Sequence, residues 1–193
     1  MRLKPLAAAL LLLPLAGCFG GGGGPDQLLT LTAAESRPPA SPRTAGQGAA
    51  VTVAEPSVPQ ALRTNRVPVY VNETTIQYLT GAAWVEYPGP LFARLLGETI
   101  AVRTGRVVLD PGQYSHDPGT RVTGNLVKFG LDPAAMEAVA IYDAAIAQQG
   151  GGVRTNRFEA RVQVSEATAE AVAPALNQAA NQVAEQVAAW VGQ

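Results

Sequence analysis

Residues 138–147 (AVAIYDAAIA) decide the fold, because they predict the middle strand of a three-stranded meander. Successive side chains of a strand point to opposite faces, so Ile141 and Tyr142 are expected on different sides of the sheet. An alternating run at 121–131 (RVTGNLVKFGL) comes before this stretch, and another at 158–164 (FEARVQV) comes after it. Strands that follow one another through turns favour an antiparallel sheet over repeated βαβ units.

Two helices are predicted outside this meander. The shorter one has Pro90 in its first turn and Gly105 just past its end, positions that suit these residues. The longer one begins at Ser165 and runs to the C-terminus, with Pro174 either kinking it or marking its true first turn. Its apolar positions recur every three or four residues: Val172, Leu176, Ala180, Val183, Val187 and Trp190. We interpret this stripe as the face packed on the sheet, and a surface for a partner helix is the alternative.

Shorter strands are expected upstream. They lie at 51–53, 67–71 and 107–109, and a hairpin around Thr80-Gly81-Ala82 joins 75–79 to 83–87. The fold class is therefore α+β: an α/β sandwich in which a mixed, mostly antiparallel sheet packs against two main helices. This domain is expected to cover residues 50–193.

The N-terminus reads as a targeting segment over residues 1–17. Arg2 and Lys4 are followed by a short apolar run at 6–13 and by the small residues Ala16 and Gly17, the order found in signal peptides. The apolar run is shorter than the roughly 20 residues of a transmembrane helix.

The tetrapeptide Leu15-Ala16-Gly17-Cys18 resembles the lipobox of bacterial lipoproteins. The resemblance implies cleavage before Cys18, a diacylglycerol on its thiol and an acyl chain on the new amino terminus. A free or disulfide-bonded thiol is the alternative, but the chain has no second cysteine to pair with it. Phe19 stands where lipoproteins retained at the inner membrane usually carry Asp, which favours an outer-membrane lipoprotein that faces the periplasm.

Residues 18–49 are expected to form a tether behind the lipidated Cys18. They are rich in Gly, Pro, Ser and Ala and poor in large apolar side chains. About 30 flexible residues would span about 30 Å on average. A short strand at 28–32 (LLTLT) could join the sheet of the domain and would shorten the free tether.

The charged residues argue against a nucleic-acid partner. Two of the 14 Lys and Arg residues lie in the signal segment, which leaves 12 against 15 Asp and Glu residues, without the excess of basic residues that such a partner requires. The residues best suited to catalysis are Tyr114-Ser115-His116-Asp117, but neighbours in a loop do not form a catalytic triad, and one His is too few for a zinc site. We therefore predict no enzyme, no metal and no cofactor other than the covalent lipid.

Several segments together resemble the ABC-type transport auxiliary lipoprotein family. The likeness covers about residues 27–193, and Trp84 is its best single mark. The segments are the lipobox, Leu29–Leu31, Val51–Pro56, Leu62–Tyr70, Ile76–Tyr78, Ala83–Pro88 and the helix that closes on Ala189-Trp190. We expect Trp84 to be a structural anchor, because a buried Trp contributes several kcal/mol to stability.

The resemblance implies a non-catalytic part of a lipid transport system. Such a protein works with an MCE-domain periplasmic protein and its ABC permease and ATPase, and it docks the periplasmic conduit at the outer membrane. A homo-oligomeric ring is compatible with this role. Two alternatives remain open: another outer-membrane adaptor, such as a cell-wall synthase activator or assembly factor, and a lipid-anchored enzyme or ligand binder.

Overall fold

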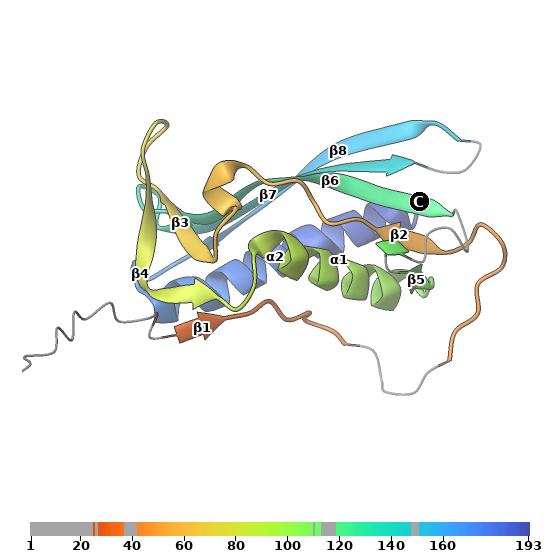
Figure 1. Ribbon diagram of the computed structural model, residues 1–193, viewed down its shortest axis with the longest axis horizontal. Helices are drawn as coiled ribbons and strands as arrows, with labels where there is room; N and C mark the ends of the chain where they lie inside the picture. The colour runs from red at the N-terminus through yellow and green to blue at the C-terminus, as the bar shows by residue number, and fades with distance from the viewer. Residues whose placement is uncertain (1–24, 26, 37–41, 110, 113–118, 148–150) are drawn as a thin grey trace, which may run out of the picture.

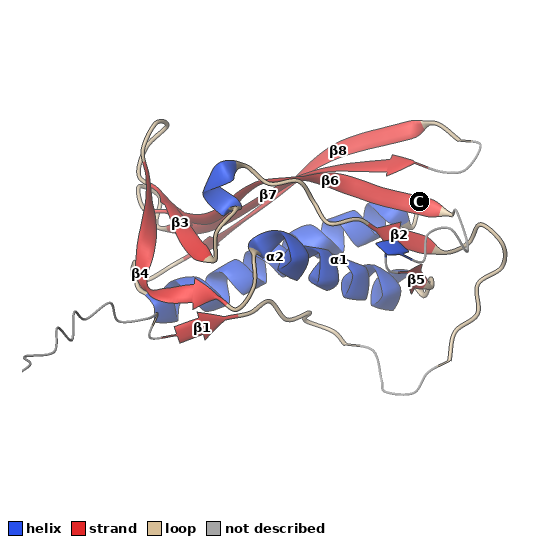
Figure 2. Cartoon of the chain, in the orientation of Figure 1, coloured by secondary structure: helices blue, strands red, loops and turns tan. Residues whose placement is uncertain are grey.

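The computed structural model describes residues 25, 27–36, 42–109, 111–112, 119–147 and 151–193. Within them, eight strands form one sheet and two long helices cover one of its faces (Figures 1 and 2). The helices are α1 (Pro88–Thr104) and α2 (Ala169–Val191). This arrangement confirms the predicted α+β class, since the long strand pairs are antiparallel and only short pairs are parallel.

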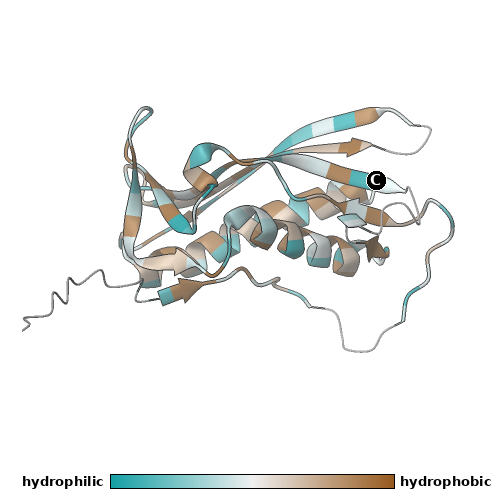
Figure 3. Cartoon of the chain, in the orientation of Figure 1, coloured by the Kyte–Doolittle hydropathy of each residue, from teal (hydrophilic) through white to brown (hydrophobic). Residues whose placement is uncertain are grey.

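The meander forms the largest part of the sheet. It consists of β6 (Thr120–Asp132), β7 (Glu137–Ala147) and β8 (Val153–Gln163), each antiparallel to the next. β7 is central, and its even-numbered side chains from Ala138 to Ile146 face the helices and belong to the core. The alternation read from the sequence thus corresponds to a helix-covered face and an outer face. Figure 3 shows hydrophilic residues along β8, whose odd-numbered side chains are exposed.

Short strands extend the sheet on the other edge of β6. Both β2 (Val51–Val53) and β3 (Arg66–Tyr70) lie parallel to β6, one at each end of it. Beyond β2 lies β5 (Val108–Leu109), and beyond β3 lies β4 (Ile76–Trp84), which is flanked in turn by β1 (Gln27–Leu29). A single turn of 3-10 helix, Gln60–Leu62, connects β2 to β3.

The core lies between the sheet and the two helices. The ring of Phe92 on α1 sits 5.1 Å from the ring of Tyr142 on β7, and Trp190 on α2 lies edge-on to Phe158 on β8 at 5.5 Å. Residues of the apolar stripe on α2 are buried, apart from the half-buried Trp190. The stripe therefore packs inside the domain, and the interpretation as a surface for a partner helix is wrong.

The predicted hairpin at Thr80-Gly81-Ala82 is also wrong. One strand, β4, runs through these residues, and Gly81 adopts a φ of 76°, a conformation that glycine reaches without steric cost. The register between β3 and β4 shifts beside this point, and β4 bends there in Figure 1. A glycine in a strand marks a bulge or bend as readily as a turn, and the pairing partners decide between them.

Helix boundaries agree better with the sequence. Pro88 and Pro90 lie in the first turn of α1, and Gly105 ends it in the left-handed conformation at φ 71°. α2 begins at Ala169 behind Thr168 rather than at Ser165, because β8 and a bend occupy the preceding residues. Pro174 lies inside α2, where it removes one backbone hydrogen bond near the helix start.

Candidate functional site

The lipobox residues Leu15, Ala16, Gly17 and Cys18 lie outside the described residues, as do the signal segment and Phe19. The described chain nearest to them is Pro25 and then the segment 27–35, which we call the N-terminal strap. The strap is therefore the part of the structure that connects the domain to the predicted anchor.

The strap begins as a strand of the sheet. β1 lies parallel to the end of β4, with Leu29 opposite Trp84, and the side chain of Gln27 donates a 2.6 Å hydrogen bond to Glu170 on α2. Leu29 is buried in the core, whereas Leu28 points away from it and is 65% exposed. The short strand expected at 28–32 is present as three residues, 27–29.

Two asparagines on α2 hold the rest of the strap. Asn177 Oδ1 accepts the backbone N–H of Thr32 at 2.9 Å, and Asn181 Oδ1 accepts that of Ala34 at 2.7 Å. Asn181 Nδ2 also donates to the carbonyl of Thr32 at 2.9 Å. Four residues of helix rise about 6 Å and two residues of extended chain about 6.6 Å, so the two spacings match. The two asparagines, four residues apart, thus form hydrogen bonds with the strap backbone as a neighbouring strand would.

An ion-pair cluster closes the end of the strap. Arg103 on α1 lies 2.7 Å from Glu185 on α2 and 3.4 Å from Glu35 on the strap. The hydrogen bond to Glu185 raises the pKa of Arg103 further above its ordinary value. The three side chains are 42–56% exposed, so these ion pairs contribute little to the stability of the domain.

Trp84 lies at the junction of strap and domain. Its side chain is 1% exposed and stacks on Phe129 with ring centres 5.3 Å apart. The indole N–H has no hydrogen-bond partner among the described atoms. Trp84 therefore fills the core below β1 and offers no polar group to a ligand.

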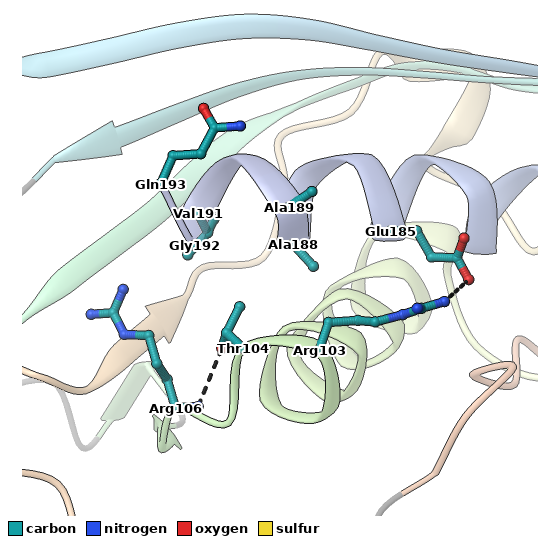
Figure 4. Close-up of a pocket in the computed structure, with 9 residues that line it drawn as sticks. All are labelled: Arg103, Thr104, Arg106, Glu185, Ala188, Ala189, Val191, Gly192 and Gln193. Atoms are coloured by element: carbon teal, nitrogen blue, oxygen red, sulfur yellow. Dashed lines mark hydrogen bonds and ion pairs between the residues drawn. The ribbon is translucent and has the colours of Figure 1, made fainter.

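A groove opens between the C-terminal ends of α1 and α2 (Figure 4). Its volume is 590 Å³, and its cationic residues are Arg103 and Arg106. Arg103 is paired with Glu185, while the guanidinium of Arg106 donates to Ala49 O, Ala50 O and Thr120 Oγ1. Both cations therefore already have partners within the domain.

The residues Tyr114–Asp117, weighed as a catalytic group, lie outside the described residues. Elsewhere in the described chain, no three His, Cys, Asp or Glu residues are grouped so that they could hold a metal ion. Among the same residues, no helix is long and apolar enough to cross a bilayer.

The sequence analysis did not find the role of Asn177 and Asn181. Their spacing of four residues was visible, yet nothing local indicates that residues 145 or more positions earlier in the chain would lie on them. It also missed the exposure of Leu28, Val85 and Tyr87, which are 65%, 54% and 58% exposed.

Comparisons with known proteins agree with this architecture. The model of one protein family, described as the ABC-type transport auxiliary lipoprotein component, matches residues 29–188. A protein from Xanthomonas campestris has a similar structure, with a TM-score of 0.67 and 20% identity over 86% of this chain and 93% of its own. An uncharacterized protein of known structure superposes with a TM-score of 0.66 at 11% identity, over 86% of this chain and 99% of its own. At these identities the two structures show a shared fold only. No curated protein was found to be similar in sequence.

Proposed function

The chain belongs to the family of ABC-type transport auxiliary lipoprotein components, and we propose that it is the outer-membrane member of a system that moves lipid across the periplasm. In this role it docks the distal end of the conduit formed by an MCE-domain protein, whose ABC permease and ATPase lie in the inner membrane. The observation that carries the proposal is the family match over residues 29–188 behind a lipobox-like Leu15–Cys18.

The anchor is the first part of the proposal. The Cys18 thiol forms a thioether with diacylglycerol, and its amino group is acylated after cleavage, so that several chains together hold the protein on the bilayer. Phe19 in place of Asp directs the lipoprotein to the outer membrane, with the domain in the periplasm.

We expect Cys18→Ser to abolish acyl labelling and to release a folded protein from the membrane fraction. Phe19→Asp is expected to keep its acyl label but to move the protein to the inner-membrane fraction of a density gradient. Continued acylation of the serine variant would refute the anchor, and an unchanged gradient position of the Asp variant would refute the sorting.

The second part of the proposal is a role without catalysis. Charged side chains on the outer face of β7 and β8 form ion pairs, such as Arg157 with Asp143 at 2.6 Å and Arg161 with Glu159 at 2.6 Å. The hydrogen bond from Arg157 lowers the pKa of Asp143 below its ordinary value, which makes the ionised carboxylate a weaker base. Such a surface suits recognition of another protein.

Co-purification tests the function. A tag placed after the exposed Gln193 should recover the MCE-domain protein, its permease and its ATPase from detergent-solubilised membranes after cross-linking in cells. The Cys18→Ser protein is the matched control, because it keeps the domain and loses the proposed anchor. Recovery of a cell-wall synthase instead would refute the transport role and support a different adaptor. Native mass spectrometry of the purified lipoprotein tests the proposed homo-oligomer.

A further inference from the structure

Three apolar side chains are exposed at the end of the domain where the strap begins. Leu28 on β1 is 65% exposed, Val85 after β4 is 54% exposed, and Tyr87 before α1 is 58% exposed. Their neighbours Leu29 and Trp84 are buried, so the chain alternates here between a core side and an outer side. We call Leu28, Val85 and Tyr87 the β1 patch.

Backbone pairing brings the patch together. Leu28 lies opposite Ala83 in the parallel register, and the N–H of Val85 donates to the carbonyl of Leu29 at 2.8 Å. Tyr87 follows two residues later, where α1 begins. Residues from two distant parts of the sequence therefore present one apolar surface beside the first described strand.

Strap docking places this surface close to the predicted anchor. Gln27 lies nine positions after Cys18, which limits the distance between them to about 30 Å in a fully extended chain. If the tether ran freely to Ala50, the same limit would be about 110 Å. The contacts of the strap with Asn177 and Asn181 thus shorten the largest distance that the tether allows between Cys18 and the domain.

From these observations we infer that the β1 patch rests on the surface of the bilayer that holds the lipid anchor. This inference rests on the proposed lipidation of Cys18. Leu28 and Val85 supply apolar area, and Tyr87 supplies an aromatic ring with a polar tip, the kind of side chain enriched at membrane interfaces. The lipid anchor supplies the affinity and a high local concentration of bilayer, so three side chains are enough to set the orientation.

Charges beside the patch are compatible with lipid contact. Glu86, between Val85 and Tyr87, forms an ion pair with Arg94, and the hydrogen bond from Arg94 lowers the pKa of Glu86. Glu170 accepts the hydrogen bond from Gln27, next to Leu28. The positive charge of Arg94 offsets that of Glu86 and reduces its repulsion by anionic headgroups, whereas the neutral amide of Gln27 leaves the charge of Glu170 in place.

A matched control position lies far from the β1 patch. β1 and the start of α2 lie toward one end of its long axis, and the free end of the β7–β8 hairpin lies at the other (Figure 1). Val153, 69% exposed on β8, lies at that distal end and is a matched control position.

Depth-dependent quenching tests the inference on the full-length lipoprotein. Leu28→Cys and Val153→Cys are each labelled with an environment-sensitive fluorophore and reconstituted in vesicles of phosphatidylethanolamine and phosphatidylglycerol that carry a nitroxide-labelled lipid. We expect the label at position 28 to be quenched at least twofold more than the label at 153. Equal quenching of the two labels would overturn the inference.

Label counting separates this inference from the anchor. Cys18 is the only cysteine, so an acylated chain takes one label and a chain with a free Cys18 takes two. Two labels would overturn the anchor, and the inference with it, whereas one label with equal quenching overturns only the orientation. A spectral shift at position 28 that depends on protein concentration in detergent would show a second copy on the patch and would also overturn the inference.

Discussion

Replacing Trp84 by Ala is the most demanding test of the core. The ring is 1% exposed and stacks on Phe129, and replacing a buried Trp by Ala typically costs about 3–5 kcal/mol. The indole N–H is buried without a partner, and its removal returns about 1 kcal/mol. We therefore expect Trp84→Ala to lower the free energy of unfolding by about 2–4 kcal/mol.

Trp84→Phe is the matched variant, because it keeps an aromatic ring against Phe129 and removes the unpaired N–H. The smaller ring of Phe lowers stability and the removal of the unpaired N–H raises it, so we expect the free energy of unfolding to change by about 1 kcal/mol or less. Urea unfolding of residues 19–193, followed by circular dichroism and by the fluorescence of Trp190, measures both variants. If Trp84→Ala unfolds within about 0.5 kcal/mol of the native sequence, or if Trp84→Phe costs as much as Trp84→Ala, the assigned packing role is wrong.

Three further predictions concern the strap, a close approach in the meander and a buried phenol. Asn181→Ala removes two of the three hydrogen bonds between the asparagines of α2 and the strap backbone. It is expected to lower the free energy of unfolding by about 1–3 kcal/mol and to speed hydrogen exchange of the Ala34 amide, while Gln178→Ala on the exposed side of α2 changes neither; a protected Ala34 amide in the Asn181 variant would contradict this. Gly124→Ala brings a methyl group against the ring of Tyr142 and should lower the free energy of unfolding by about 2–3 kcal/mol, whereas Gly97→Ala in α1 has room for the methyl group and should raise it by about 0.5–1 kcal/mol. If the melting temperatures of the two glycine variants shift in the same direction, the packing described is wrong. Burial raises the pKa of the Tyr142 hydroxyl, so the folded state loses stability as pH rises above the ordinary tyrosine pKa of about 10. Tyr142→Phe is expected to be at least as stable as the native sequence at pH 8 and to lose less stability between pH 8 and pH 11; an equal loss of stability in urea titrations would contradict the burial of this hydroxyl.

Local patterns were enough to predict much of the fold. The alternation in residues 138–147 gave the central strand of the meander, and Gly105 gave the end of α1. These signals depend on neighbours a few residues apart, where side-chain direction and helix capping act directly. The hairpin at Gly81 failed for the opposite reason: a glycine permits a turn and a bend equally, and pairing with β1 and β3 selects the bend.

The candidate site was predicted only in part. Cys18 and its neighbours resemble a linear motif, a pattern of adjacent residues, so the sequence alone is enough to predict a lipidation site there. The strap depends on contacts between residues about 145 positions apart, such as Thr32 with Asn177, and no local pattern reports such a contact. The same holds for the β1 patch, since Leu28 and Val85 meet only through the β1–β4 pairing.

By itself, the sequence determined the strands of the meander, the two helices and the cysteine at which a lipid is expected. Each of these rests on periodicity or on a short motif, and both are properties of adjacent residues. Tertiary structure alone decided that Asn177 and Asn181 bind the strap and that Leu28 stays outside while Leu29 is buried. The physical reason is that burial and backbone pairing depend on which distant segment completes the surface, and only the folded chain provides that partner.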